Sequence, residues 1–214
     1  VTWTSIFEEQ ASLGIGDMAL APSNPSIIYV GTGENLKKPR NFTLPGTGMY
    51  RSNDGGKSWT HIGLRDSWSI AEITVHPTNP DIVMVAVLGH LWSTNRNRGL
   101  YRTEDGGKTW QQVLYKDEKT GANMVVISPS NPSVMYASMW EVYPGISGAN
   151  SGVYKSVDSG KTWVPSGNGL PTGEKIGRIG LAVSASNPYK AYAPVSYTHL
   201  RAHETKANLV CRLL

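Results

Sequence analysis

Short runs of apolar and β-branched residues alternate along the chain with clusters of proline, asparagine, aspartate and glycine. Near the N-terminus, the runs 17–21, 26–31, 48–52 and 58–63 each have the length and composition of a short strand. The residues between them favour turns, as in the "PSNP" run 22–25. No long amphipathic helix is predicted. The pattern therefore indicates antiparallel strands joined by turns and loops.

The same order of segments recurs at a nearly constant period. Asp54, Asp105 and Asp158 are 51 and 53 residues apart, and each follows a glycine-apolar-tyrosine-basic run. An Asn-Pro turn recurs in phase with them. Repeated four-stranded units of about 50 residues predict β-propeller blades. The predicted fold class is all-β: a β-propeller fragment of about three and a half four-stranded antiparallel blades in residues 1–194.

One turn motif occurs three times, as "SNDGGKSW" (52–59), "TEDGGKTW" (103–110) and "SVDSGKTW" (156–163). In each copy the aspartate can accept hydrogen bonds from the backbone of its own turn, and the indole is large enough to fill a gap between blades. The residues with this predicted structural role are Asp54, Trp59, Asp105, Trp110, Asp158 and Trp163. Catalytic or calcium-binding aspartates are disfavoured, because a calcium loop needs more oxygen ligands. No metal and no cofactor are predicted.

This motif resembles the Asp-box (BNR) repeat of sialidase-like propellers. The Asn-Pro turn and the phrases "GTGEN", "VLGHLW" and "SMWEV" are more similar to the sortilin/VPS10-like group of BNR-repeat proteins. The resemblance covers about residues 1–194 and implies the propeller fold. The family includes glycosidases, sorting receptors, assembly factors and secreted proteins. It therefore implies an extracellular or periplasmic location, with any signal peptide upstream of Val1.

Both ends depart from the repeat. Trp3 matches the tryptophan of the turn motif, so we expect the chain to begin inside a blade. The segment 195–214 matches no repeat position and resembles a translated sequencing adaptor, so we expect it to be non-native and to make few contacts with the blades. It holds the single cysteine and half of the net charge of +4. The remaining charge predicts no nucleic-acid partner, and no apolar run is long enough to cross a bilayer.

Function is expected on the longer loops. Antiparallel strands place the Asn-Pro turns and the aspartate turns on one face, and the loops after each second strand on the other. Aromatic rings beside Glu and Arg suit carbohydrate or protein recognition by stacking and charge-assisted hydrogen bonds. The predicted ligand-binding residues are Glu34, His90, Trp92, Arg96, Trp140 and Glu141. Two alternatives remain open: Trp92 and Trp140 could pack between blades, and His90 could be structural.

The main functional prediction is a propeller that binds a protein or glycan ligand, without membrane insertion. One alternative is a glycoside hydrolase with an incomplete site, since Glu34, Asp66, Glu118 and Glu141 offer carboxylates. Such an enzyme needs two carboxylates about 5–5.5 Å apart for retention and a wider pair for inversion. The other alternative is a scaffold or assembly factor. No catalytic residue is assigned.

Overall fold

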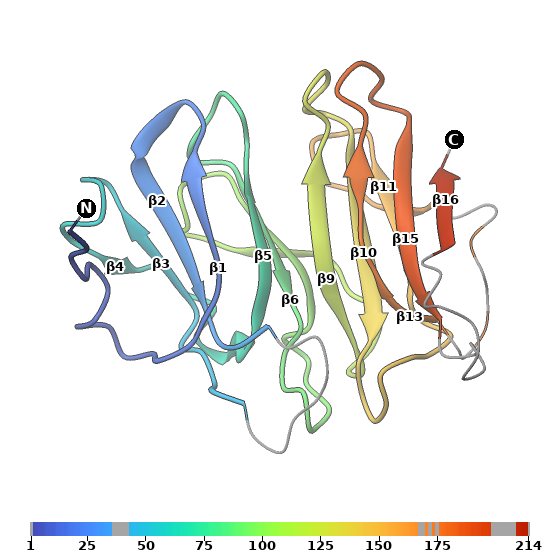
Figure 1. Ribbon diagram of the computed structural model, residues 1–214, viewed down its shortest axis with the longest axis horizontal. Coiled ribbons are helices and arrows are strands. Elements are labelled where there is room, and N and C mark those ends of the chain that lie inside the picture. The colour runs from blue at the N-terminus through green and yellow to red at the C-terminus, as the bar shows by residue number, and fades with distance from the viewer. Residues whose placement is uncertain are drawn as a thin grey trace.

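The computed structural model describes residues 2–35, 43–166, 170, 173, 176–197 and 209–213. In this part of the chain the regular structure is antiparallel β-sheet apart from one 3-10 turn, and four sheets stand side by side as an arc (Figure 1). The prediction of an all-β propeller fragment built from four-stranded antiparallel blades is confirmed.

The first three sheets each follow the order of the chain. The first contains β1 (Ile15–Ala21), β2 (Asn24–Thr32), β3 (Met49–Ser52) and β4 (Thr60–His61). After the 3-10 turn η1 (Arg65–Ser67), the second contains β5 (Ile70–Val75), β6 (Val83–Val87), β7 (Gly99–Thr103) and β8 (Gln111–Leu114). The third contains β9 (Thr120–Ile127), β10 (Met135–Glu141), β11 (Gly152–Ser156) and β12 (Val164–Pro165).

The fourth sheet differs from the others. Its inner position is divided between β13 (Ile176–Ile179) and β14 (Ala182–Val183), which both pair with β15 (Ala191–Tyr197). The other edge of β15 pairs with β16 (Leu209–Leu213). The expectation that the segment 195–214 makes few contacts is therefore wrong for residues 195–197, which belong to β15 and pair with β13, and for residues 209–213. An unpaired strand edge accepts an extended segment through its backbone groups, whatever the side chains. Residues 198–208 lie outside the described part, and the proposed adaptor origin of the tail stays a prediction.

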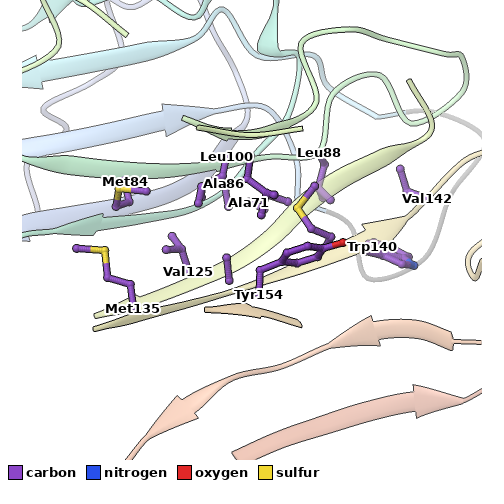
Figure 2. Close-up of a cluster of buried hydrophobic side chains, with 14 of the residues drawn as sticks. Ala71, Met84, Ala86, Leu88, Leu100, Val125, Met135, Trp140, Val142 and Tyr154 are labelled. Atoms are coloured by element: carbon purple, nitrogen blue, oxygen red, sulfur yellow. The ribbon is translucent and has the colours of Figure 1, made fainter. Parts of the chain in front are cut away.

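Successive side chains of the second strands point to opposite sides of the sheet, and both sides contribute to the core. In β6, Val83, Val85 and Val87 face the first sheet, whereas Met84 and Ala86 face the third. Because successive side chains point to opposite faces, one apolar strand supplies two packing layers. Figure 2 shows the layer between the second and third sheets, with Met84 and Ala86 opposite Val125 and Met135. Complete burial of a Met or Val side chain contributes about 1.5–3 kcal/mol.

Hydrogen bonds place the predicted turns on one face of the arc. The aspartate turn of each blade donates a backbone N–H to the segment after the Asn-Pro turn: Gly55 to Ser26, Gly106 to Asp81, and Ser159 to Ser133. We call this end of the sheets the turn face. The loops after β2, β6 and β10 lie at the opposite end, which is the lower end in Figure 1. We call that end the loop face.

The three aspartate turns share one hydrogen-bond pattern. In the second blade, Asp105 Oδ1 accepts from the Thr109 backbone N–H at 3.0 Å and from the Thr103 hydroxyl at 2.7 Å. Its Oδ2 accepts from the Thr109 hydroxyl at 2.6 Å. Ser52, Asp54 and Ser58 repeat these contacts, as do Ser156, Asp158 and Thr162. The carboxylates are therefore occupied by their own turns.

The tryptophans that close these turns are expected to fill gaps between blades and to be buried, but all three are only partly buried. Trp59 and Trp110 reach back toward the preceding segment, where their Nε1–H groups donate to Ile6 O and Ile62 O at 2.6 Å. Trp163 instead donates to Gly160 O within its own turn at 3.1 Å. The placement is thus equivalent in two copies and different in the third. One side of each ring stays accessible because these turns lie at the surface.

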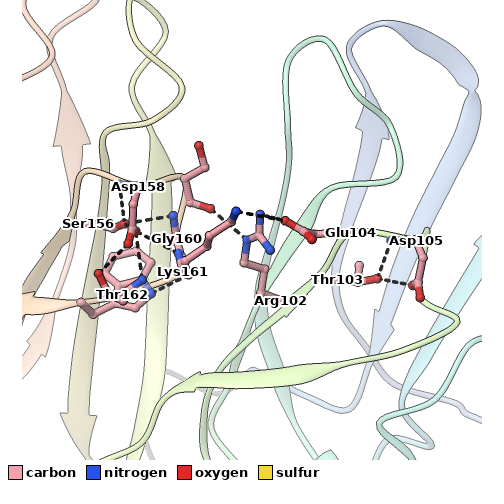
Figure 3. Close-up of polar contacts among 11 residues, drawn as sticks. Arg102, Thr103, Glu104, Asp105, Ser156, Asp158, Gly160, Lys161 and Thr162 are labelled. Atoms are coloured by element: carbon pink, nitrogen blue, oxygen red, sulfur yellow. Dashed lines mark hydrogen bonds and ion pairs between the residues drawn. The ribbon is translucent and has the colours of Figure 1, made fainter.

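A basic residue of each third strand connects neighbouring blades. Arg51 donates to Gly106 O at 3.2 Å, and Arg102 Nε donates to Ser159 O at 2.9 Å, in each case reaching the aspartate turn of the next blade. Arg102 also pairs with Glu104 at 2.6 Å, as Figure 3 shows beside the Asp158 turn. The basic position of the repeat therefore fixes the order and angle of adjacent blades.

Candidate functional site

The inner strands of the four blades converge on the axis of the arc. Backbone register shifts occur in each of them at the end near the loop face: between Ile15 and Asp17, between Ile70 and Glu72, opposite Ser138 and Met139, and between Ile176 and Ile179. Bulges of this kind bend a strand and redirect its side chains, and they are common beside active sites. Each inner strand carries one polar or charged residue at this level. They are Asp17, Glu72, Asn123 and Arg178.

These side chains line a hollow of about 720 Å³. Asn35 extends into it from the loop after β2, so the hollow lies toward the loop face. Its remaining lining consists mostly of small residues: Gly16, Ala71, Met124, Gly180, Pro194 and Ser196. A concave site with few convergent polar groups is the usual form of a small-molecule or glycan site.

The two carboxyl groups come from neighbouring blades and are electrostatically coupled. Asp17 Oδ2 accepts a hydrogen bond from the Ile73 backbone N–H at 2.7 Å, next to Glu72. Burial, and then the negative charge of Asp17, raise the pKa of Glu72 to about 7, against smaller opposing effects of the Val125 amide and Arg178. Glu72 is therefore largely protonated below neutral pH, where an ordinary glutamate is charged.

The other two polar residues keep unused hydrogen-bonding capacity. Asn123 is 3% exposed and donates from Nδ2 to Ile179 O at 3.0 Å, while its Oδ1 has no partner. Arg178 Nη2 donates to Asn35 Oδ1 at 3.3 Å. Asn35 is held in turn by a bond from its Nδ2 to Ala71 O at 2.8 Å. The hollow thus combines a carboxyl pair with a cation and an unsatisfied amide oxygen.

The structure distributes the predicted ligand-binding residues along the loop face. The Glu34 carboxylate accepts from the Leu44 N–H at 3.2 Å, and the Glu141 carboxylate accepts from the Asn150 N–H at 3.0 Å. Arg96 pairs with Glu118 at 2.9 Å. These three charged side chains hold their own or adjacent loops in place. The structure does not bring the six predicted residues together in one cluster.

His90 and Trp92 lie on the loop after β6. The His90 ring stacks on Trp68 of the preceding inter-blade loop, with centroids 3.7 Å apart. Burial, and then the Arg98 cation, lower the pKa of His90, so it is neutral near pH 7. Trp92 is 51% exposed. An exposed indole near a stacked aromatic pair offers apolar faces to a ligand.

Trp140 does not contact solvent, which corrects its prediction as a ligand-binding residue. The side chain is 2% exposed and packs in the layer between the second and third sheets (Figure 2). Its Nε1–H donates to Ile146 O at 2.8 Å. The alternative that this tryptophan packs between blades is therefore the right one. Its ring lies beneath the Arg178 guanidinium, 5.9 Å from the centroid.

A buried arginine rigidifies the loop that carries Trp92. Arg98 is 0% exposed, and its guanidinium donates to the backbone carbonyls of Leu88, His90, Ser93 and Glu118. Burial lowers its pKa to about 10. This residue was not singled out from the sequence, because its function depends on carbonyls from two separate loops. For the inner-strand residues, the sequence did contain a signal: Asp17, Glu72 and Arg178 each directly follow a glycine or an alanine.

No three His, Cys, Asp or Glu side chains within the described ranges gather closely enough to hold a metal ion. In the same ranges, no helix has the length and apolarity needed to cross a membrane.

The chain is similar to xyloglucan-degrading enzymes over much of its length. A probable oligoxyloglucan-reducing end-specific xyloglucanase of Neosartorya fischeri is 25% identical over 168 residues, which covers 73% of this chain and 18% of that enzyme. A xyloglucanase of Acetivibrio thermocellus is 24% identical over 196 residues, which covers 76% of this chain and 21% of that enzyme. The chain therefore spans about a fifth of the length of these relatives.

Solved structures of similar fold include two GH74 proteins. The GH74 enzyme of Niastella koreensis matches with a TM-score of 0.56 and 22% identity, over 82% of this chain and 24% of that one. The GH74 xyloglucanase of Xanthomonas campestris matches with a TM-score of 0.57 and 17% identity, over 88% of this chain and 28% of that one. At this identity the likeness concerns the fold alone.

A family model described as sortilin, neurotensin receptor 3 matches residues 47–171. This range contains all three copies of the aspartate turn and the whole of the second and third sheets. The resemblance to the sortilin/VPS10-like group is thus confirmed. Since the match covers more than half of the chain, the chain belongs to the Sortilin-Vps10 family.

Proposed function

We propose that the chain forms the glycan-binding arc of a glycoside hydrolase, with Asp17 and Glu72 as its acid pair. The observation that carries this proposal is the raised pKa of Glu72, about 7, beside the Asp17 carboxylate in a hollow near the loop face. Glycoside hydrolysis requires two carboxyl groups, and their different environments must keep one protonated and the other charged.

The roles of the pair follow from their surroundings. Glu72 retains its proton below neutral pH and donates it to the leaving glycosidic oxygen as the C–O bond breaks. Asp17 is fixed by the Ile73 N–H and acts as the carboxylate partner, on the sugar itself or on the attacking water. Both side chains come from inner strands that are packed into the core. Their geometry is therefore set by the sheets.

The loop face provides a path for the chain of sugars. Trp92 is exposed on a loop held by Arg98, and the neutral Trp68–His90 stack lies nearby. Pyranose rings present apolar faces that stack on indoles, while their hydroxyl groups bond to groups such as Glu34, Arg96 and Glu141. Five of the six sequence-predicted residues, all except Trp140, are thus used together with the hollow. Trp92 is the anchor in this proposal.

The relatives support a polysaccharide as the substrate class. Two of them are named xyloglucanases, so we assign xyloglucan or a similar plant-type glucan as the first substrate to test. Such a substrate lies outside the cell, so the proposal includes an extracellular or periplasmic location. Because the chain spans about a fifth of these relatives, it supplies one part of a larger substrate-binding surface.

Release of reducing ends from xyloglucan tests this function. We expect hydrolysis by the wild-type protein, and a loss of more than about 100-fold in Glu72→Gln and Asp17→Asn, because general acid-base groups contribute factors of this size. Asp81→Asn, a carboxylate on the turn face, is the matched control and should leave the rate unchanged. Wild-type rates in both hollow variants would contradict the proposal.

A binding protein without hydrolysis is the second candidate. The family description, which names a receptor, favours it. In this case the same hollow and loop face hold a glycan or protein, and the carboxyl pair serves recognition. Binding of xyloglucan oligosaccharides with no release of reducing ends, in a protein that contains every blade of its ring, would select this candidate over the hydrolase.

A further inference from the structure

Arg178 has no carboxylate partner among the described residues. The ion pairs in that part of the chain involve Arg51, Arg96, Arg102 and Lys161. The guanidinium of Arg178 has five N–H donors, and one of them bonds to Asn35 at 3.3 Å. Partly buried arginines are normally paired, because desolvating a cation without a partner is costly. Arg178 lines the hollow, and among the described residues no ion pair or further hydrogen bond occupies its other donors.

The surroundings hold this cation in a fixed orientation. The Trp140 ring lies beneath the guanidinium, and Trp140 is itself fixed by its bond to Ile146 O. On another side, Asn35 connects Arg178 to the first blade, 143 residues away in sequence. A planar guanidinium that is fixed by stacking and by one hydrogen bond is prepared for a bidentate contact with a planar anion.

A second polar group in the hollow also lacks a partner. Asn123 is almost completely buried, and its Oδ1 accepts no hydrogen bond. A buried acceptor without a donor is destabilising, because the group has lost its hydrogen bonds to water. Sugar hydroxyl groups are donors that could satisfy it. The hollow therefore offers a site for an anionic group beside a site for a hydroxyl group.

We infer that Arg178, with Asn35 and Asn123, recognises the carboxylate of a uronic acid residue, so that the hollow binds glycans carrying a uronic acid more tightly than neutral glycans. This inference rests on the proposed function and specifies the substrate class of the same hollow. Glu72 and Asp17 also face the hollow, from β5 and β1. When Glu72 is protonated, below about pH 7, its carboxyl group does not repel an incoming carboxylate.

The C-terminal carboxylate of a peptide has similar charge, but the observations favour a sugar. A uronic acid combines a carboxylate with several hydroxyl donors on one ring, which matches both Arg178 and the Asn123 oxygen. A peptide C-terminus offers a carboxylate and one nearby N–H.

Calorimetric titration with matched probes tests the inference. The probes are xylotetraose, the same backbone carrying one glucuronic acid, and a tetrapeptide with a free or an amidated C-terminus. With the Glu72→Gln protein, which excludes hydrolysis, we expect the acidic oligosaccharide to bind at least tenfold more tightly than the neutral one. Arg178→Gln should abolish this difference, and Arg178→Lys should retain part of it. Arg65→Gln, an exposed arginine of the inter-blade loop, is the control.

The outcomes separate this inference from the proposed function. Hydrolysis of neutral glycans that is unaffected by Arg178→Gln, in a variant with a wild-type melting temperature, overturns the inference and leaves the hydrolase intact. Tight binding of the acidic oligosaccharide without cleavage supports the inference and contradicts the hydrolase. Preference for the free peptide C-terminus over both sugars overturns the inference. In the wild-type protein, the preference for the acidic probe should also weaken above pH 7, and Glu72→Gln should remove this dependence.

Discussion

At the scale of single residues, the carboxyl groups of this protein fall into two electrostatic classes. The aspartates of the turns accept several hydrogen bonds, led by the hydroxyls of Ser58 and Thr109, and these lower the pKa of Asp54 and Asp105 well below the ordinary value of 3.8. Glu72 has the opposite shift, because burial disfavours its charged form. The first class is suited to holding turns together, and the second to proton transfer.

The first prediction concerns Asp105, whose carboxylate organises its turn. A lowered pKa in the folded state means that this carboxylate stabilises the fold above pH 4 and loses that effect as the pH falls through and below 3.8. Asp105→Ala should therefore lower the melting temperature at pH 7, and the difference should shrink below pH 3. Glu8→Gln, which removes an exposed carboxylate outside these turns, is the control. Loss of ligand binding without a change in melting temperature would instead give Asp105 a functional role.

The second prediction concerns Glu72. Its pKa is raised from 4.5 to about 7. Below pH 4.5 the carboxyl group is protonated in the folded and the unfolded protein, so it does not change the free energy of unfolding. Above pH 7 the charged, partly buried carboxylate lowers that free energy by its full amount. Replacing it with glutamine should stabilise the protein at pH 8 by on the order of 2–3 kcal/mol, and should change little at pH 4. Urea unfolding at both pH values measures this. If Glu72→Gln destabilised the protein equally at pH 4 and at pH 8, the burial assigned to Glu72 would be contradicted.

At the scale of elements, loops are fixed by residues that the repeat pattern does not contain. Arg98 and Arg96 are two positions apart on one loop, yet one is buried among carbonyls and the other is exposed in a surface ion pair. Arg98→Met should destabilise by roughly 3 kcal/mol, because several buried carbonyls lose their donor. Arg96→Gln should cost less than about 1 kcal/mol. Hydrogen exchange across residues 88–98 should rise in the first variant, and equal effects of both would contradict this account.

The repeat pattern predicted the strands and turns, but not the hollow. Asn-Pro turns and glycine-rich aspartate turns have local causes, so their positions can be read from a single segment. The cluster of Asp17, Glu72 and Arg178 depends on backbone register shifts in three inner strands and on the angle between blades. Trp140 illustrates the same limit, since the sequence left burial and ligand contact both open, and only packing between sheets decides. Long-range geometry accounts for each of these differences.

At the scale of the whole molecule, four similar sheets support one asymmetric site. The first three blades bury both faces of their second strands, and the third-strand arginines Arg51 and Arg102 each bond to the following blade, so the inner strands are held at set positions around the axis. The scaffold repeats, whereas the inner polar residues change from blade to blade: an aspartate, a glutamate, an asparagine and an arginine. This combination is how a repeat fold provides specific chemistry.

The pH dependence of kcat/KM on xyloglucan, between pH 5 and 9, tests the central claim most directly, because it reports the ionisation of the acid pair in the free protein. The account predicts activity that falls as the pH rises through about 7, since Glu72 then loses the proton it must donate. Glu72→Gln should be inactive throughout. A rate that is constant or rises across pH 6–8, or a Glu72→Gln variant with wild-type activity, would contradict it.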